Sequence, residues 1–361
     1  MDFLAGFTIF LIALIMVINL VPGILVGIQS QRIDYDAVAY RTAVILLEDP
    51  GWGYDRNLNT STTHWEQQLA FTSDVSRFGL AVSKETPNIL SRNKIETFFT
   101  SGLFTRDDYE RKAVFADLPY APYGYRIALA IDGEGTKSTG DTVPEVSYGY
   151  MRRFVKVKDY TSATLPAAPY VASVPITNTT GLNHTTYLAV VLNYTELNEP
   201  VISDAFRINP QSDNVTVTLT GLTEALQATA NFTDIQQVTL TGVTLSKWDL
   251  ATSPPRWVNQ TIFLRDYVLY NQTPAQVQDG GVAFPVRNTT TLGLELLPPL
   301  PFAEDPNAVI SINFTFRYDW ASATNAENQH NFVFDNDVFA YSPATVTVPA
   351  LKNGVVEVAI W

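Results

Sequence analysis

The first fifty residues constrain the chain most. No charged side chain occurs from Phe3 to Ile28, a run that reads FLAGFTIFLIALIMVINLVPGILVGI. A helix of about 20 apolar residues is long enough to cross the hydrocarbon core of a bilayer. The run therefore predicts a hydrophobic helix that is buried in lipid or in an assembly of copies.

A one-sided apolar pattern follows the uncharged run. Apolar residues recur there at steps of four and three, which is the period of an amphipathic helix, at positions Ile33, Ala37, Tyr40, Val44 and Leu47. Pro50 and Gly51 then end the pattern. The simplest interpretation is one long helix over residues 1–50, which would reach roughly 70 Å at 1.5 Å per residue.

Three interpretations of this stretch stay open. It is a cleaved secretory signal, a plain membrane anchor, or a pilin-type helix that sits in the membrane and later packs against its own copies. The run is longer than the apolar region of a signal peptide. Pro22 and Gly23 lie inside it, and a proline there removes a backbone donor and kinks or locally melts a helix. A lone anchor gains nothing obvious from this kink, which favours the pilin-type helix.

The sequence DFLAGFTIFLIALIMVINLVPG followed by IDYDAVAYRTAVILLEDPGW resembles the N-terminal segment of archaeal type IV pilin-like surface proteins, especially those of methanogens. The most specific block holds Asp34, Tyr35, Asp36, Tyr40 and Arg41. The likeness extends to about Tyr160 and includes, farther on, Trp52, Phe78-Gly79-Leu80-Ala81, Ile89-Leu90-Ser91, Lys94-Ile95 and Tyr109-Glu110.

The resemblance implies a helix in a filament core, a β-rich outer domain and polymerisation of identical copies. It assigns the helix contacts to Phe7, Phe10, Leu11, Leu14, Ile18, Asn19, Pro22 and Gly23. The sequence departs from related pilins in two ways. The apolar run has no Glu near its start, and no Lys/Arg-Gly cleavage site precedes Gly6. We expect either processing upstream of Met1 or a chain that is not processed in this way.

Composition narrows the class of protein further. The net charge of −13 argues against a nucleic-acid partner, which needs a basic face. There is no cysteine, so disulfides, thiolate zinc sites and iron–sulfur clusters are excluded. Residues 161–361 hold 7 Lys and Arg against 17 Asp and Glu, whereas residues 1–160 hold 16 against 19. An acidic, solvated outer half fits an extracellular protein.

The pattern of elements predicts an α+β fold, in which a long N-terminal hydrophobic helix precedes a β-rich head. Residues 51–160 read as a mixed α/β module. Its two alternating strands, Tyr123–Ile131 and Tyr148–Val157, are most simply an antiparallel hairpin. Residues 161–361 contain roughly ten short Thr- and Val-rich strands at regular spacing, which predicts an antiparallel β-sandwich.

The strongest functional motif is the glycosylation acceptor Asn-x-Ser/Thr. It occurs ten times without proline in the middle, at Asn59, Asn178, Asn183, Asn193, Asn214, Asn231, Asn259, Asn271, Asn288 and Asn313. Chance matches in a Thr-rich β domain are the alternative. Nine of the ten lie between residues 178 and 313, so we expect the β-sandwich to be a glycosylated outer layer.

Catalysis and metal binding have little support. The three histidines, His64, His184 and His330, lie far apart in polar stretches, and the chain has no G-x-S-x-G elbow and no phosphate-binding loop. We expect no enzyme activity and no cofactor. The acidic loops Asp132–Asp141 and Asp335–Asp337 could bind Ca²⁺, although neither has EF-hand spacing and solvated turns explain both.

These observations predict the major pilin of an extracellular archaeal type IV pilus-like filament. Its N-terminal helix would occupy the cytoplasmic membrane before assembly, and its glycosylated heads would adhere to external surfaces or other cells. The main alternative is a singly anchored, non-polymerising surface glycoprotein or adhesin. A minor pilin that starts or caps a filament is a third possibility.

Overall fold

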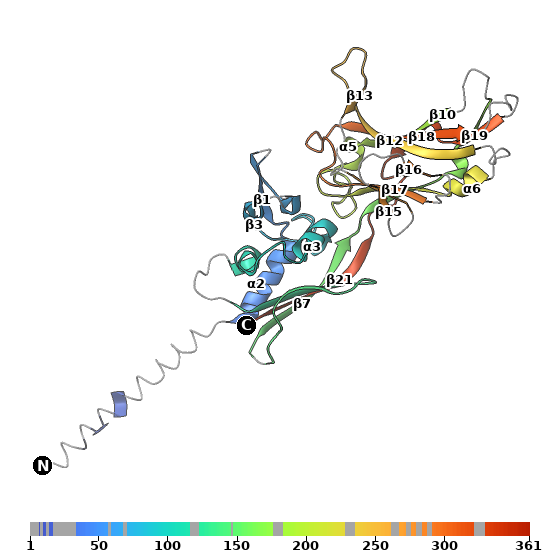
Figure 1. Ribbon diagram of the computed structural model, residues 1–361. Coiled ribbons are helices and arrows are strands. Elements are labelled where there is room, and N and C mark those ends of the chain that lie inside the picture. The colour runs from blue at the N-terminus through green and yellow to red at the C-terminus, as the bar shows by residue number, and fades with distance from the viewer. Residues whose placement is uncertain are drawn as a thin grey trace.

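The structure is a computed structural model. It describes residues 7, 10, 11, 14–16, 34–56, 59–67, 71–115, 123–145, 147–175, 183–227, 235–260, 267–271, 276–278, 284–286, 291–320 and 329–361. The described chain is rich in β-strands and forms two modules (Figure 1). We call residues 34–158 together with 351–361 the proximal module, and residues 161–350 the distal module.

A five-stranded sheet forms the base of the proximal module. Its order is β4-β7-β21-β5-β6, in which β4 runs parallel to β7 and the other neighbours are antiparallel. The strands are β4 (Ile89–Ser91), β5 (Tyr125–Ile131), β6 (Lys137–Gly140), β7 (Gly149–Lys158) and β21 (Leu351–Ile360). The central strand, β21, is thus the last strand of the sequence, and it pairs with two strands from the first half of the chain.

Helix α2 (Tyr35–Glu48) packs on one face of this sheet, against β7 and β21. Its buried face consists of small and aliphatic residues, namely Ala39, Thr42, Ala43, Leu46 and Leu47. Gly149 permits the close approach, because a Cβ there would lie 2.1 Å from the Tyr35 backbone. The apolar stripe of the sequence is only partly on this buried face: Leu47 is buried and Val44 is partly exposed, whereas Ala37 is exposed and Tyr40 is 56% exposed.

The predicted single helix over residues 1–50 is wrong. Helix α2 begins at Tyr35, and Asp34 before it has a non-helical backbone (φ −80°, ψ 87°). The Asp34 side chain accepts a hydrogen bond from the amide of Ala37, so it caps a new helix rather than continuing an old one. Among the described residues, no helix combines the length and the apolar character needed to span a membrane.

The predicted hairpin between residues 123–131 and 148–157 is also wrong. Strands β5 and β7 each pair with β21, which lies between them. Local sequence favours neighbours along the chain, whereas the alternation of buried Val356, Val358 and Ile360 makes β21 a better central strand. The inner face of the sheet then buries one core with α2, Phe78, Phe98 and Tyr109.

The distal module contains two larger sheets and one two-stranded sheet. The first larger sheet has the order β13-β12-β18-β10-β20, with β16 on β12, and the second has the order β15-β14-β17-β11-β8. Strands β19 and β9 form the two-stranded sheet. The strands are β8 (Thr161–Pro166), β9 (Val171–Pro175), β10 (Asn183–Asn193), β11 (Val215–Thr220), β12 (Ile235–Asp249), β13 (Arg256–Gln260), β14 (Tyr267–Asn271), β15 (Gln276–Gln278), β16 (Phe284–Pro285), β17 (Thr291–Leu296), β18 (Val309–Trp320), β19 (Gln329–Val333) and β20 (Asp335–Tyr341).

These sheets share one apolar core. Strands such as β11 contribute every second side chain to it. They are not the purely antiparallel sandwich of the predicted fold class. Strand β20 runs parallel to β10, and β8 runs parallel to β11. Strand alternation identifies buried faces but not pairing direction, so the sequence pattern had no means of detecting these parallel edges.

Shorter elements complete the two modules. The three-stranded sheet β2-β1-β3 lies in the proximal module. The remaining elements are β1 (Trp52–Asp55), β2 (Thr60–Thr62), β3 (Val75–Arg77), α3 (Arg92–Phe98), α4 (Arg106–Tyr109), α5 (Tyr194–Leu197), α6 (Leu222–Gln227), η1 (Trp65–Gln67), η2 (Thr72–Asp74), η3 (Glu110–Phe115) and η4 (Ala168–Tyr170).

The predicted division into residues 1–50, 51–160 and 161–361 stays a prediction. The strand pairing shows a feature that this division did not include: β21, at the end of residues 161–361, pairs with strands of residues 51–160. The chain therefore crosses between the modules twice, once after β7 and once before β21. The crossings lie side by side: the Asp159 amide donates to Ala350 O (2.9 Å) and the Thr347 amide donates to Ser162 O (2.9 Å).

The central position of β21 is testable with a pair of substitutions on opposite faces of that strand. Val358 is fully buried and Val355 is partly exposed. We expect Val358→Ala to lower the free energy of unfolding by about 2 kcal/mol, because it leaves a cavity in the proximal core. We expect Val355→Ala to change it by less than about 0.5 kcal/mol. Equal effects in denaturant unfolding would contradict the position of β21.

Candidate functional site

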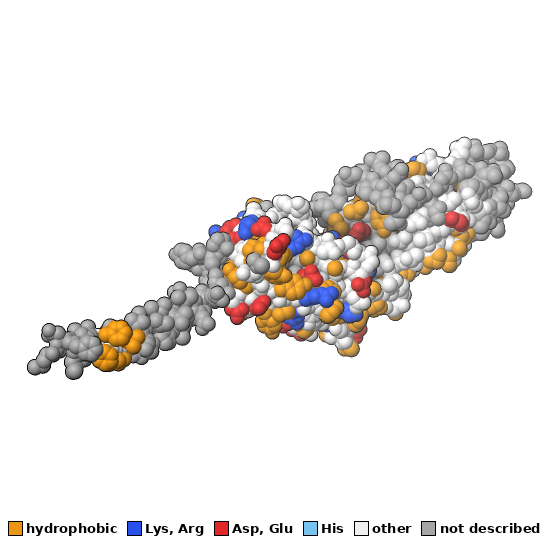
Figure 2. Space-filling model, turned by 90° about the horizontal axis from the view of Figure 1, so that it is seen from below, with side chains coloured by type: hydrophobic (Ala, Val, Ile, Leu, Met, Phe, Trp, Pro, Cys, Tyr) orange, Lys and Arg blue, Asp and Glu red, His pale blue; other side chains and the backbone are white. Residues whose placement is uncertain are grey.

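The predicted polymerisation residues fall partly within the described chain. Phe7, Phe10, Leu11 and Leu14 are helical, and their side chains are 38–61% exposed. They form the orange patch set among grey atoms near the N-terminal end in Figure 2. Ile18, Asn19, Pro22 and Gly23 lie outside the described residues. Apolar side chains with this exposure are available to a partner surface.

The predicted glycosylation sites have different environments. Asn59, Asn183 and Asn259 are exposed, whereas Asn193 and Asn313 are partly exposed and hydrogen-bonded within the distal module. Asn271 lies in β14, and its side chain is not described. The remaining acceptors, Asn178, Asn231 and Asn288, lie outside the described residues.

Asn214 differs from the other described acceptors because it is only 5% exposed. Its Nδ2, the atom that would carry a glycan, donates to Glu295 Oε1 at 2.6 Å. Its Oδ1 accepts a hydrogen bond from Asn93 Nδ2 at 3.0 Å. A glycan on Asn214 is incompatible with this packing.

Site-resolved glycopeptide mass spectrometry of the protein from its native cells tests this difference. We expect glycans at Asn59, Asn183 and Asn259, whose side chains are exposed, and none at Asn214. Full occupancy at Asn214 would show that the contact between the modules is not the one described here.

The three histidines are not brought together. His64 lies in the proximal module, whereas His184 and His330 lie on β10 and β19 of the distal module. His184 Nε2 is 3.7 Å from Asp335 Oδ1, and the ring packs on Phe332 with 4.4 Å between centroids. The prediction that the chain is not an enzyme stays a prediction.

The first acidic loop uses its carboxylates in ion pairs. Glu134 binds Arg92 through two hydrogen bonds of 2.6 and 2.7 Å, and it also lies 3.2 Å from Lys352 Nζ. Arg92 holds the pKa of Glu134 well below its usual range, at about 2. In the second loop, burial and the neighbouring Asp335 raise the pKa of Asp337. Within the described ranges, no group of three or more acidic or histidine side chains is placed to hold a metal ion.

The Glu134 ion pair predicts a specific loss of stability in acid. The pKa of Glu134 is about 2 in the folded chain, below the value of about 4.3 for a free Glu. Its contribution is therefore fully present above about pH 5 and disappears as the pH falls toward 2. We expect Glu134→Gln to reduce the change in melting temperature across this pH window. An unchanged pH profile would contradict the pairing.

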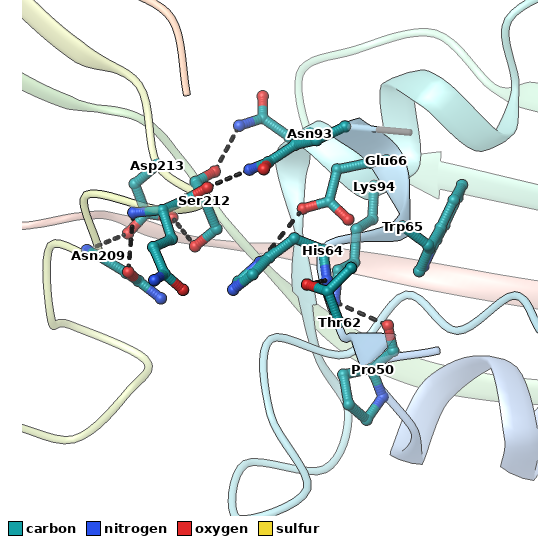
Figure 3. A network of polar contacts seen from close by, with 12 residues as sticks. Pro50, Thr62, His64, Trp65, Glu66, Asn93, Lys94, Asn209, Ser212 and Asp213 are labelled. Atoms are coloured by element: carbon teal, nitrogen blue, oxygen red, sulfur yellow. Dashed lines mark hydrogen bonds and ion pairs between the residues drawn. The ribbon is translucent and has the colours of Figure 1, made fainter. Parts of the chain in front are cut away.

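The sequence analysis missed a polar junction at which the two modules meet. Lys158 at the end of β7 is 4% exposed, and its Nζ donates to Asp213 Oδ2 (2.7 Å) and Arg207 O (2.6 Å). Asn93 on α3 donates to Ser212 O (2.6 Å), and its Oδ1 accepts from the hydroxyl of Tyr160 (3.0 Å). Lys158 thus joins the proximal sheet to Arg207 and Asp213 of the distal module. Asn93 joins helix α3 to the loop that contains Ser212, as Figure 3 shows.

Asn93 and Lys158 were missed because they are ordinary polar residues in polar stretches. Alternation along β7 would place Lys158 with the outward residues Arg152 and Lys156, so its burial has no local signal. Their partners in these contacts are 49 to 119 residues away along the chain, so no short motif joins them.

A second polar cluster lies next to the junction, also in Figure 3. Glu66 is 5% exposed, and within the described chain neither of its carboxylate oxygens has a hydrogen-bond partner. His64 Nδ1 lies 3.7 Å from Glu66 Oε1. Lys94 is almost completely buried and donates to the carbonyls of Pro50 (2.7 Å) and Ala81 (3.1 Å). Burial lowers the pKa of Lys94, and Glu66 opposes that shift.

Two cavities follow the same boundary. One of about 390 Å³ is lined by His64 and Lys158 from the proximal module and by Arg207 and Gln211 from the distal module. The other, of about 600 Å³, lies between Glu66 and Asn93 on one side and Glu295 on the other. The junction is therefore a polar contact, whereas the cores of both modules are apolar. Its chemistry suits holding two bodies in a fixed orientation.

Comparison of the chain with protein-family models, with curated proteins and with solved structures found no match. The resemblance of the chain up to about Tyr160 to archaeal pilin-like surface proteins therefore stays an expectation.

Two lysines on β7 make a matched test of the junction. Lys158→Met removes the cation from a buried ion pair, so the Asp213 carboxylate loses its lysine partner. We expect a loss of about 3 kcal/mol in the free energy of unfolding. Lys156, two positions earlier, is exposed, so Lys156→Met should cost less than about 0.5 kcal/mol. Similar losses for both variants in urea unfolding would show that the Lys158 contact does not hold the modules together.

Proposed function

We propose that the chain is a structural subunit of an extracellular filament, similar in design to archaeal type IV pili. Its apolar N-terminal segment, residues 3–28, would be held in the cytoplasmic membrane before assembly and then pack against the same segment of other copies. The observation that carries the proposal is the exposure of large apolar side chains at Phe7, Phe10 and Leu14, within a run that has no charge. Such side chains need either lipid or protein around them.

The outer stripe of α2 supports the same proposal. Ala37 and Tyr40 are exposed although they continue the apolar period of the sequence, and the helix buries its other face on the proximal sheet. A second copy that packs along the N-terminal segment would reach this stripe next. An isolated membrane anchor has no use for exposed apolar positions on a helix outside the lipid.

The rest of the chain supports an outward-facing role. The distal module lies far from the N-terminal end in Figure 1, and it contains the exposed acceptors Asn183 and Asn259. In a filament this module would form the outer layer and contact external surfaces or other cells, with glycans shielding its strand edges.

The alternative is a non-polymerising adhesin anchored singly in the membrane. The same exposed glycan acceptors favour it equally, because an adhesin also presents a solvated outer module. The two functions differ in what surrounds the apolar segment, which is lipid for the adhesin and other copies for the filament subunit.

A charge placed in the apolar segment separates them. Leu14→Glu buries a carboxylate in the filament core, at a cost of at least about 3 kcal/mol per subunit, which corresponds to a more than 100-fold weaker association. We expect material sheared from cells to show filaments of this chain by electron microscopy and mass spectrometry. Filaments should be lost in Leu14→Glu and kept in the matched control Leu14→Ile.

Two results would contradict the proposal. One is a wild-type chain that stays in detergent-solubilised membranes as a monomer, with no filaments at the cell surface. The other is a normal yield of filaments from Leu14→Glu.

A further inference from the structure

The outer face of the proximal sheet has no covering element among the described residues. Helix α2 lies on the opposite face, and the side chains of β7 alternate between the two. The outward positions on β7 are Tyr150, Arg152, Phe154 and Lys156, of which Phe154 is 74% exposed. We call this surface, together with the outward positions of β21 and β5, the outer sheet face.

Its middle is an apolar groove that crosses neighbouring strands. Phe154 on β7 is opposite Val355 on β21, and Val355 is opposite Ala130 on β5. Ile89 on β4 and Pro87 continue the groove, which has a volume of about 440 Å³. A large exposed aromatic side chain beside small neighbours leaves room for a foreign side chain to pack against its ring.

Cations surround the groove. Arg126, Arg152 and Lys156 are outward-facing on β5 and β7, and the guanidinium of Arg152 lies 5.3 Å from the centre of the Phe154 ring. Glu357 is the acidic residue at the outward positions of these three strands, and Asp132 follows the end of β5. Figure 2 shows orange and blue side chains side by side on the proximal module. Arg152 Nε lies 3.5 Å from Glu357 Oε1, so with Asp132 at the groove the face has an excess of one cation, in a chain with a net charge of −13.

We propose that the outer sheet face binds the distal module of a second copy of the chain. The inference rests on the proposed filament and names a contact outside its core. The distal module, residues 161–350, carries 16 Asp and Glu against 6 Lys and Arg, so it supplies acidic groups that complement Arg126, Arg152 and Lys156. Complementary charge of this kind sets orientation and excludes wrong partners.

Two copies of the outer sheet face do not suit each other. A symmetric pairing would bring Arg126, Arg152 and Lys156 of both copies into one interface, which doubles the number of cations there. It would also close after two subunits, whereas a contact between different surfaces repeats without limit. A head-to-tail contact between the proximal module of one copy and the distal module of the next therefore brings opposite charges together. It also repeats along an open-ended filament.

Photo-crosslinking on the full chain tests the contact. Phe154 is replaced by p-benzoylphenylalanine, filaments are assembled from a mixture of ¹⁴N- and ¹⁵N-labelled chains, and crosslinked peptides are identified by mass spectrometry. We expect mixed-isotope crosslinks from position 154 to residues 161–350. The control places the same probe at Phe71, an exposed residue of the proximal module outside this face, and should not give these crosslinks.

Charge reversal gives a second readout. The pair Arg126→Glu and Arg152→Glu should lower the crosslink yield from position 154 at least fivefold, whereas Arg111→Glu, an exposed cation outside the face, should leave it unchanged. Unchanged melting temperatures show that the variants are folded.

Several results would overturn the inference while leaving the filament intact. They are crosslinks from position 154 to the proximal module of another copy, to residues 1–33, to a different protein, or only within one chain. A yield that is insensitive to charge reversal would also overturn it. If the wild-type chain forms no filaments, the proposed function itself fails and this contact fails with it.

Discussion

The pairing of β21 with β5 and β7 is the constraint on which the rest of the structure depends. It places the last strand of the sequence in the centre of the proximal sheet, so this sheet is complete only because the chain returns to it from the distal module. It also brings the two crossings of the chain together. Between them, Asp159 accepts from both Arg92 and Lys352, at 3.1 and 2.8 Å. Bending at the boundary would break the hydrogen bonds between the two crossings as well as these ion pairs.

The polar junction fixes the orientation of the two modules relative to each other. Buried pairs such as Lys158 and Asp213 contribute less net stability than their attraction suggests, because each charge loses its water. They do require one geometry, since a displaced junction would leave the same charges buried without partners. A filament subunit benefits from such rigidity, because small errors in the orientation of each head accumulate along a polymer. The apolar N-terminal segment would supply attachment between copies, and the two joined modules would set the spacing of the outer layer.

The sequence revealed local properties better than long-range ones. Alternation identified Tyr123–Ile131 and Tyr148–Val157 as strands, and the structure has β5 at Tyr125–Ile131 and β7 at Gly149–Lys158. Alternation could not show that β21 would separate β5 from β7, because pairing partners depend on the whole core rather than on neighbouring residues. The apolar stripe read from the sequence matches the buried face of α2 only in part: Leu47 is buried, whereas Ala37 and Tyr40 are exposed and the small residues Ala39 and Ala43 are buried instead. The expected continuous first helix was also wrong, because Asp34 caps the start of a separate helix.

The candidate site shows the same limit. Exposed acceptors such as Asn183 could be identified by motif, but the burial of Asn214 depends on Asn93 and Glu295, which no motif links to it. The junction itself is built from side chains that pair across 55 residues or more.

Hydrogen–deuterium exchange of the full chain tests the central role of β21 most directly. Strands at the end of a sequence usually fray and exchange quickly unless they are held on both sides. The account predicts that amides of residues 354–360 exchange as slowly as those of β5 and β7, and that all three strands lose protection together as denaturant is added. Rapid exchange in β21 while β5 and β7 stay protected would contradict it.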